Sequence, residues 1–198
     1  MAHHVIYIPG LGDHRSYGQE IAVVNYWRLF GLHAHYLALG WRHREGLDTK
    51  IKRLTDMIDG LADQGHTVSL CGTSAGASAA LMAYALRPNL NGVVTIAGKV
   101  NHPETISQAT RDANPDFYAA MEHVQGNLQT LSRRGDLENI LCVYARHDNI
   151  IPFKDSIIAG SGKHRVAGWS HSSAIFFGII FGAPVIARFL RSRPHLFV

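Results

Sequence analysis

The chain has 198 residues, of which 46% are hydrophobic and 17% charged, a balance typical of a compact fold and unlike that of a disordered chain. Its formal net charge is +4, but the basic residues lie in short, scattered groups such as Arg42–Arg44 and Lys50–Arg53. Because they form no dense basic stripe with interleaved aromatics, we expect no nucleic-acid partner. The sequence shows no repeat or linker-like stretch, so we expect a single domain over residues 1–198.

Apolar runs alternate with helical patterns along the chain. Six runs predict strands, at Val5–Ile8, Leu32–Leu39, Thr67–Cys71, Val93–Ala97, Ile140–Ala145 and His164–Ala167. Helices are predicted at Tyr17–Phe30, from an Asp48 cap to a stop at Gly65, at Ala75–Arg87, at His102–Arg134 with a break near Asn114–Pro115, and at the C-terminus. This alternation indicates an α/β fold, with a mainly parallel central sheet and helices on both faces. In such a sheet, functional side chains gather in the loops beyond the carboxyl ends of the strands.

The C-terminal run Ala174–Ala187 carries no charge and is rich in Ile and Phe. It is shorter than the roughly 20 apolar residues that a membrane-spanning helix needs, and Gly178, Gly182 and Pro184 interrupt it. We therefore expect a buried, broken helix and no membrane association.

Two features of the sequence bear on the cellular compartment of the protein. Cys71 and Cys142 lie inside apolar runs typical of buried strands, which favours two core thiols over a disulfide. The start of the chain, Met1–Ile8, lacks the charged segment and long apolar run of a secretory signal. We expect a cytoplasmic protein.

The sequence Gly72-Thr73-Ser74-Ala75-Gly76 matches the G-x-S-x-G pattern and falls between a predicted strand and an Ala-rich predicted helix. In that context the turn holds the serine in a strained conformation and projects its hydroxyl away from the sheet. The pattern arises by chance about once in ten chains of this composition, so its placement adds most of the specificity. The alternative is a tight strand–helix turn with an inert serine. If Ser74 is a nucleophile, it needs a base and an orienting acid.

With the residues that follow it, this pattern resembles the α/β-hydrolase superfamily, in which the nucleophile, the acid and the histidine occur in that order along the chain. Asp148 comes just after the fifth predicted strand and shortly before Ile151-Pro152, as in the acid loop of that family. His171 follows the last predicted strand and precedes the C-terminal helix, as in its histidine loop. The resemblance covers nearly the whole chain, from Val5 to Leu190. It implies an α/β-hydrolase fold, a cofactor-independent serine hydrolase without a large cap domain, and a triad of Ser74, Asp148 and His171.

Rivals for the base and the acid are few. Of the 13 histidines, only His164 and His195 also follow Asp148 at a reasonable gap, the first at or before the last strand and the second in the tail. Asp136 lies ahead of the fifth strand, at the opposite end of the sheet, and Asp155 belongs to the segment after Pro152. Asp148 as a solvated loop residue remains the alternative.

Acyl transfer creates a negative oxygen that backbone amides must receive. The resemblance assigns one donor to Ala75 and another to the loop Pro9-Gly10-Leu11-Gly12-Asp13, where the family's His-Gly-x-x segment has proline in place of histidine. In that loop Leu11 is the expected donor and Gly12 the alternative. A dinucleotide-binding loop would need glycine where Arg15 stands, so we expect no cofactor.

Metal binding is not expected either. His33 and His35 share one face of a predicted strand, but no carboxylate or thiol ligand is obviously near.

The predicted function is hydrolysis of a short carboxylic ester or thioester through an acyl-enzyme. Only 74 residues separate Ser74 from Asp148, so residues 102–134 could form at most a modest lid. Lys99 and Asn101 follow the fourth strand and are expected to border the pocket and contact a polar end of the substrate. Four aromatic residues could form an apolar wall, namely Trp41, Trp169, Phe176 and Phe177. The alternatives are a non-catalytic binding protein of hydrolase-like fold, or an acyltransferase or lipase acting on lipids.

Overall fold

The structure is a computed structural model, and it describes residues 2–13, 18 and 22–192. Six strands form one sheet in the order β2-β1-β3-β4-β5-β6, and every neighbouring pair is parallel. The strands are β1 (His3–Ile8), β2 (His33–Tyr36), β3 (Thr67–Thr73), β4 (Val93–Ile96), β5 (Ile140–Ala145) and β6 (Gly162–Val166). All six therefore end at the same edge of the sheet, which is where the fold places its loops for chemistry.

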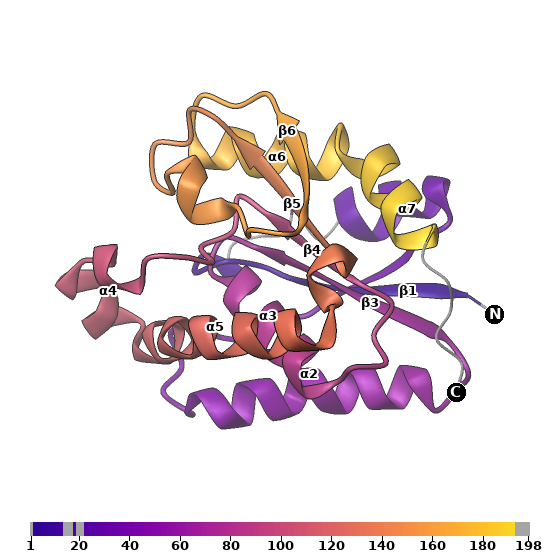
Figure 1. The fold of residues 1–198 in the computed structure, drawn as a ribbon, viewed down its shortest axis with the longest axis horizontal. Helices are drawn as coiled ribbons and strands as arrows, with labels where there is room; N and C mark the ends of the chain where they lie inside the picture. The colour runs from indigo at the N-terminus through magenta and orange to yellow at the C-terminus, as the bar shows by residue number, and fades with distance from the viewer. Residues whose placement is uncertain (1, 14–17, 19–21, 193–198) are drawn as a thin grey trace.

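Helices cover both faces of this sheet (Figure 1). The first layer contains α2 (Leu47–Ala62), α3 (Gly76–Leu86) and α5 (Pro115–Arg134), with the short α4 (Gln108–Ala113) leading into α5. The second layer contains the π-helical turn η2 (Ala22–Tyr26), the 3₁₀ turn η3 (Trp27–Phe30), α6 (His171–Ile180) and α7 (Ala183–Arg191). Three further 3₁₀ turns lie in loops: η4 (Pro103–Thr105), η5 (Asp136–Asn139) and η6 (Phe153–Ser156).

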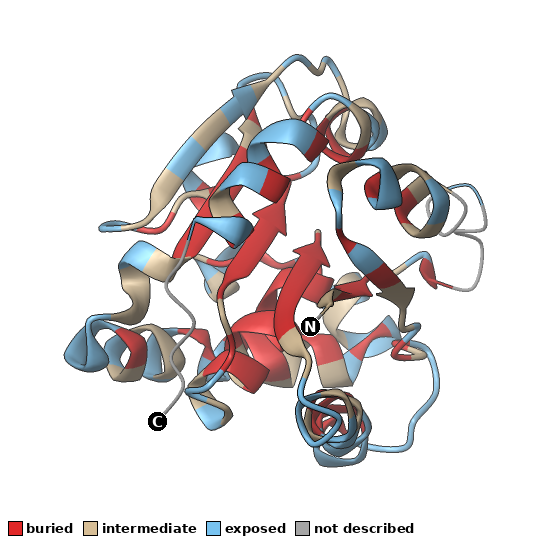
Figure 2. Cartoon of the chain, turned by 90° about the vertical axis from the view of Figure 1, so that its right-hand side faces the viewer, coloured by how far each residue is buried: buried red, intermediate tan, exposed pale blue. Residues whose placement is uncertain are grey.

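Each face of the sheet has its own hydrophobic core, because side chains alternate along a strand. On β1, Ile6 and Ile8 pack with α2, α3 and α5, whereas Val5 and Tyr7 pack with α6 and α7. Figure 2 shows the central strands buried along nearly their whole length. Strands buried on both faces explain the near-continuous apolar runs in the sequence.

The predicted fold class is confirmed, and most element boundaries agree within a few residues. The predicted break at Asn114–Pro115 separates α4 from α5. The α5 helix buries Phe117, Met121, Val124 and Leu131 against the first core, so residues 115–134 form a core helix and not a lid.

Three local predictions are wrong. Gly46, with φ 88°, stands at the N-cap of α2, while Asp48 lies in the first turn. The second strand is shorter than predicted, covering only His33–Tyr36. The predicted helix Tyr17–Phe30 starts outside the described residues, and over 22–30 it consists of π and 3₁₀ turns that end at Gly31 as expected.

The C-terminal apolar run is broken, as predicted, between α6 and α7, which are bent by 57° relative to each other. The expectation that this run is buried is wrong for its outer side, where Phe176 and Phe181 are 55% and 64% exposed. Within the described part of the chain no single helix is long and apolar enough to cross a membrane, although these two together reach that length and composition. Both Cys71 and Cys142 are buried free thiols, and burial raises the pKa of the Cys71 thiol.

Candidate active site

The turn between β3 and α3 places Ser74 at the carboxyl edge of the sheet. Ser74 has φ 52°, a left-handed conformation that is strained for a residue with a side chain. A Cβ atom on Gly72 would overlap the backbone of Gly76 and Ala77, and one on Gly76 would overlap the carbonyl oxygens of Ile8 and Pro9. Both glycines of the pattern are therefore required by the close approach of β3, α3 and β1.

His171 is the first residue of α6, and the start of that helix fixes its position. Ser170 caps the helix and exchanges hydrogen bonds with Ser173 in a capping box. The backbone N–H of His171 also donates to Asn149 Oδ1 at 2.9 Å. In this position the imidazole Nε2 lies 2.9 Å from Ser74 Oγ.

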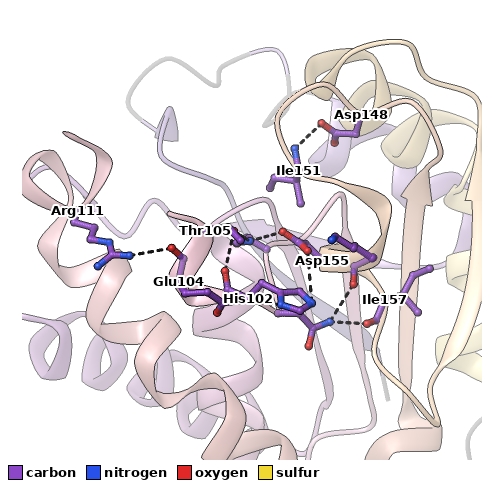
Figure 3. Close-up of polar contacts among 11 residues, drawn as sticks. His102, Glu104, Thr105, Arg111, Asp148, Ile151, Asp155 and Ile157 are labelled. Atoms are coloured by element: carbon purple, nitrogen blue, oxygen red, sulfur yellow. Dashed lines mark hydrogen bonds and ion pairs between the residues drawn. The ribbon is translucent and has the colours of Figure 1, made fainter. Parts of the chain in front are cut away.

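Asp148 lies on the other side of the imidazole, with its Oδ2 2.7 Å from His171 Nδ1. Its Oδ1 accepts hydrogen bonds from the amides of Ile150 and Ile151, each at 2.9 Å, and Figure 3 shows the second of these. Burial opposes the charge of Asp148, but the hydrogen bonds from His171 and the two amides outweigh it and hold the pKa of the carboxyl below its ordinary value. The structure thus joins Ser74, His171 and Asp148 in one hydrogen-bonded chain.

The loop that carries Asp148 is tied to the nucleophile turn through Lys99. The Lys99 amide donates to Ser74 O at 3.0 Å, and its ammonium lies 2.5 Å from Asp155 Oδ2 and 2.7 Å from Thr105 Oγ1. Asp155 is 1% exposed and Lys99 6%, so this is a buried ion pair. Figure 3 shows Asp155 with His102 and Thr105 beside it.

This arrangement corrects the expectation that Lys99 and Asn101 contact the substrate. The Lys99 ammonium is used inside the protein, and the Asn101 amide donates to Ile157 O at 2.7 Å. Both side chains hold loops together. Sequence reasoning missed this because nothing local marks Asp155 as a buried partner for a lysine 56 residues away.

The loop after β1 lies directly against the nucleophile. A Cβ atom on Gly10 would lie 2.8 Å from Ser74 Cβ, so only glycine fits there. Asp13, which is 6% exposed, holds the loop: its amide donates to Gly10 O at 3.1 Å and its Oδ2 accepts from the Gly40 amide at 2.6 Å. No described residue accepts a hydrogen bond from the amides of Leu11 or Ala75, which leaves both N–H groups available beside Ser74.

The predicted aromatic wall divides into two parts. Trp41 is fully buried, and its indole N–H donates to Pro9 O at 3.2 Å, so it supports the β1 loop from behind. Trp169 and Phe176 are instead 72% and 55% exposed on the second layer. The expectation of one wall is wrong for Trp41.

The histidines considered for metal binding lie at the opposite edge of the sheet. His33 and His35 stack with His4, which also stacks on His66. Within the residues that the structure describes, no three His, Cys, Asp or Glu side chains are arranged to hold a metal ion. Arg15 and His195, weighed above, lie outside those residues.

Comparison with known proteins places the fold. No protein-family profile matches the chain, and no curated protein matches it significantly. Among solved structures, the chain is similar to Est1E from Butyrivibrio proteoclasticus, with a TM-score of 0.71 and 12% identity over 96% of this chain and 87% of that one. It is also similar to a monoacylglycerol lipase from Paleococcus ferrophilus, with a TM-score of 0.62 and 15% identity over 96% and 94% of the two chains.

A third neighbour is the esterase domain of a Rhodothermus marinus protein, with a TM-score of 0.68 and 12% identity over 96% of this chain and 86% of that one. The alignments cover most of each of these three neighbours. The position of the strained Ser74 turn, the all-parallel sheet and the two helical layers agree with the same architecture. The chain has the α/β-hydrolase fold over nearly its whole length, in a small form without a large cap.

Proposed function

We propose that the protein is a serine hydrolase that cleaves a carboxylic ester or thioester with Ser74, His171 and Asp148 as its triad. The observation that carries this proposal is the continuous hydrogen-bonded chain from Asp148 through the imidazole to the Ser74 hydroxyl, with distances of 2.7 and 2.9 Å. Three residues far apart in sequence meet in the geometry that nucleophilic catalysis requires.

The proposed reaction has two halves. Ser74 Oγ attacks the carbonyl carbon while His171 Nε2 takes the hydroxyl proton, and the carbonyl oxygen becomes an anion facing the amides of Leu11 and Ala75. The tetrahedral intermediate then expels the alcohol or thiol, which receives the proton from His171, and leaves an acyl group on Ser74. Water, deprotonated by His171, attacks this ester and releases the carboxylic acid, which restores the enzyme.

Asp148 acts on the imidazole and not on the substrate. Its carboxylate holds the proton on Nδ1, so that Nε2 is free to accept from Ser74, and stabilises the imidazolium that forms. The low pKa of this carboxyl supports the role, because the group stays charged across the neutral range.

The substrate class is supported by the neighbours' chemistry. Est1E has been seen with ferulic acid bound, and others are described as an esterase and a lipase. We therefore infer a carboxylic ester as the substrate. The hydrogen-bonded chain through Ser74, His171 and Asp148 favours catalysis over a non-catalytic binding role.

A fluorophosphonate probe tests the proposal, because it reacts only with an activated serine. We expect labelling of the wild type at Ser74, located by peptide mass spectrometry, and none in Ser74→Ala or His171→Ala. Ser172→Ala is the matched control, because Ser172 is exposed beside His171 and belongs to no part of the triad. Equal labelling of Ser74→Ala, or no turnover of p-nitrophenyl esters of any chain length, would contradict a serine hydrolase.

A further inference from the structure

The described part of the second helical layer carries no acidic side chain. Residues 22–40 and 156–192, which include η2, η3, α6 and α7, contain neither Asp nor Glu. Arg28, Arg188 and Arg191 are exposed there, and none of the three forms an ion pair within the described part of the chain. Arg191 also bonds Phe30 O, so the ends of α7 and η3 lie side by side. Among the residues that the structure describes, no acidic side chain on this face compensates its positive charge.

The same layer exposes large aromatic side chains. Trp169, Phe176 and Phe181 are 72%, 55% and 64% exposed. Phe177 contacts all three, with ring centroids 5.5 Å from Trp169, 5.7 Å from Phe176 and 5.4 Å from Phe181. We call these four residues the aromatic face. These rings form an exposed aromatic cluster along α6, and clustered exposed apolar groups commonly mark interaction sites.

The aromatic face begins at the candidate active site. Trp169 precedes His171 by two residues, and the face continues along the outer side of α6, the helix that His171 begins. Ile150, two residues after Asp148, is 67% exposed. The apolar surface therefore starts beside the acid and the histidine and extends away from them toward the arginines of α7.

We propose that the aromatic face docks on an anionic lipid surface and brings the active site to acyl esters held there. The proposal rests on the proposed function and narrows its substrate to lipid esters. It replaces the expectation of no membrane association, because the aromatic side chains of the C-terminal run are exposed. Aromatic side chains bind at the boundary between lipid headgroups and acyl chains, and arginines beside them attract anionic headgroups. The absence of acidic side chains from the described part of this layer matches such a surface.

A second copy of the chain fits this face less well. A symmetric dimer pairs the same surface on both subunits, so the unpaired arginines of α7 would face each other without a compensating acid. Charge complementarity thus favours lipid over self-association.

Sedimentation with vesicles tests the docking. We expect the wild type to pellet with vesicles of mixed phosphatidylcholine and phosphatidylglycerol and to remain in solution with phosphatidylcholine alone. Phe176→Ser with Phe181→Ser should lower partitioning about tenfold or more, and each of Arg188→Gln and Arg191→Gln about fivefold. Leu86→Ser is the matched control, since Leu86 is 51% exposed on α3 in the other layer.

Tryptophan fluorescence gives an independent signal. The chain has three tryptophans, and Trp27 and Trp41 are fully buried while Trp169 is 72% exposed. Emission should therefore shift to shorter wavelength when mixed vesicles are added, and this shift should vanish in Trp169→Phe.

The outcomes separate this proposal from the proposed function. Ser74→Ala should bind vesicles like the wild type, and the Phe176→Ser/Phe181→Ser variant should hydrolyse soluble p-nitrophenyl acetate at the wild-type rate but lose activity on esters embedded in mixed vesicles. Equal pelleting of this variant and Leu86→Ser would overturn the docking, as would no pelleting of the wild type. So would a dimer by light scattering that the aromatic variant makes monomeric.

Discussion

The two helical layers each bury a hydrophobic core against one sheet, but their outer sides differ. Residues 41–139, which supply the first layer, contain 11 of the 15 acidic residues of the chain. Several of these are paired within the layer, as in Arg87 with Asp59 at 2.7 Å and Lys50 with Asp116 at 3.0 Å. The described part of the second layer has basic and aromatic groups and no acidic side chain. The first layer pairs several of its charges internally, whereas Arg28, Arg188 and Arg191 on the second layer form no ion pair with a described residue.

The largest expected effect lies at the carboxyl edge, between the layers. Asp148→Asn removes the charge that orients and stabilises the imidazole, and we expect kcat to fall by roughly 10⁴ with little change in KM. Steady-state kinetics on a p-nitrophenyl ester measure both values. Asp136→Asn, an acid at the far end of β5, is the control and should keep the wild-type rate. A loss below tenfold in Asp148→Asn would exclude Asp148 as the acid.

The buried Lys99–Asp155 pair should dominate stability. Asp155→Asn leaves the Lys99 ammonium buried without its partner, and we expect the free energy of unfolding to fall by about 3 kcal/mol. The double variant Lys99→Met/Asp155→Leu removes both charges and should recover much of that loss. Urea titrations compare the two. If the double variant is as unstable as the single one, packing and not charge explains the effect.

The histidine stack at the amino edge predicts a pH effect of intermediate size. Burial, with repulsion from His66, His35 and His33, lowers the pKa of His4 to about 4 from 6.5. The unfolded chain therefore binds more protons between these pH values, so stability is highest above pH 6.5 and falls as the pH drops toward 4. We expect a loss on the order of 1 kcal/mol after allowance for solvent screening.

Thermal unfolding followed at several pH values checks this expectation. His4→Gln should flatten the dependence below pH 6.5. A variant at His123, which lies on α5 away from the stack, should keep the wild-type slope. An unchanged slope in His4→Gln would remove His4 as the cause.

The smallest effect on stability is expected for an exposed ion pair on the first layer. Asp59→Asn breaks an ion pair with Arg87 in which both side chains are more than one-third exposed. Exposed ion pairs contribute about 0 to 1 kcal/mol to stability. The free energy of unfolding of Asp59→Asn should therefore differ little from that of the wild type, and the difference should be smaller still at high salt. A large loss of unfolding free energy would contradict the assignment of this ion pair as a weakly stabilising surface contact.

Local patterns account for most of what the sequence predicted. The Ser74 turn and the β3 and β5 strands depend on short-range signals: a glycine pair, an apolar run and a following Ala-rich helix. Asp148 and His171 were predicted by resemblance, and the structure places them within hydrogen-bond distance of each other and of Ser74. Their catalytic role, the single domain and the cytoplasmic location stay predictions.

The missed features depend on contacts between distant residues. Lys99 was expected at a substrate pocket because its ion-pair partner is far along the chain. The sequence suggests Trp41 as part of an apolar wall. Its actual partner, the Pro9 carbonyl oxygen, comes near the indole only when the β1 loop is folded. The turns over 22–30 pack between β2 and α6, which no local propensity encodes.

One helix, α6, carries both the candidate catalytic histidine and the exposed aromatic residues. His171 is the first residue of α6, and the exposed aromatic residues lie further along the same helix. The first turn is fixed independently of the rings, by the Ser170 capping box and by the hydrogen bond from the His171 amide to Asn149. Side chains on the outer side of this helix can therefore be exchanged while the proton acceptor keeps its position.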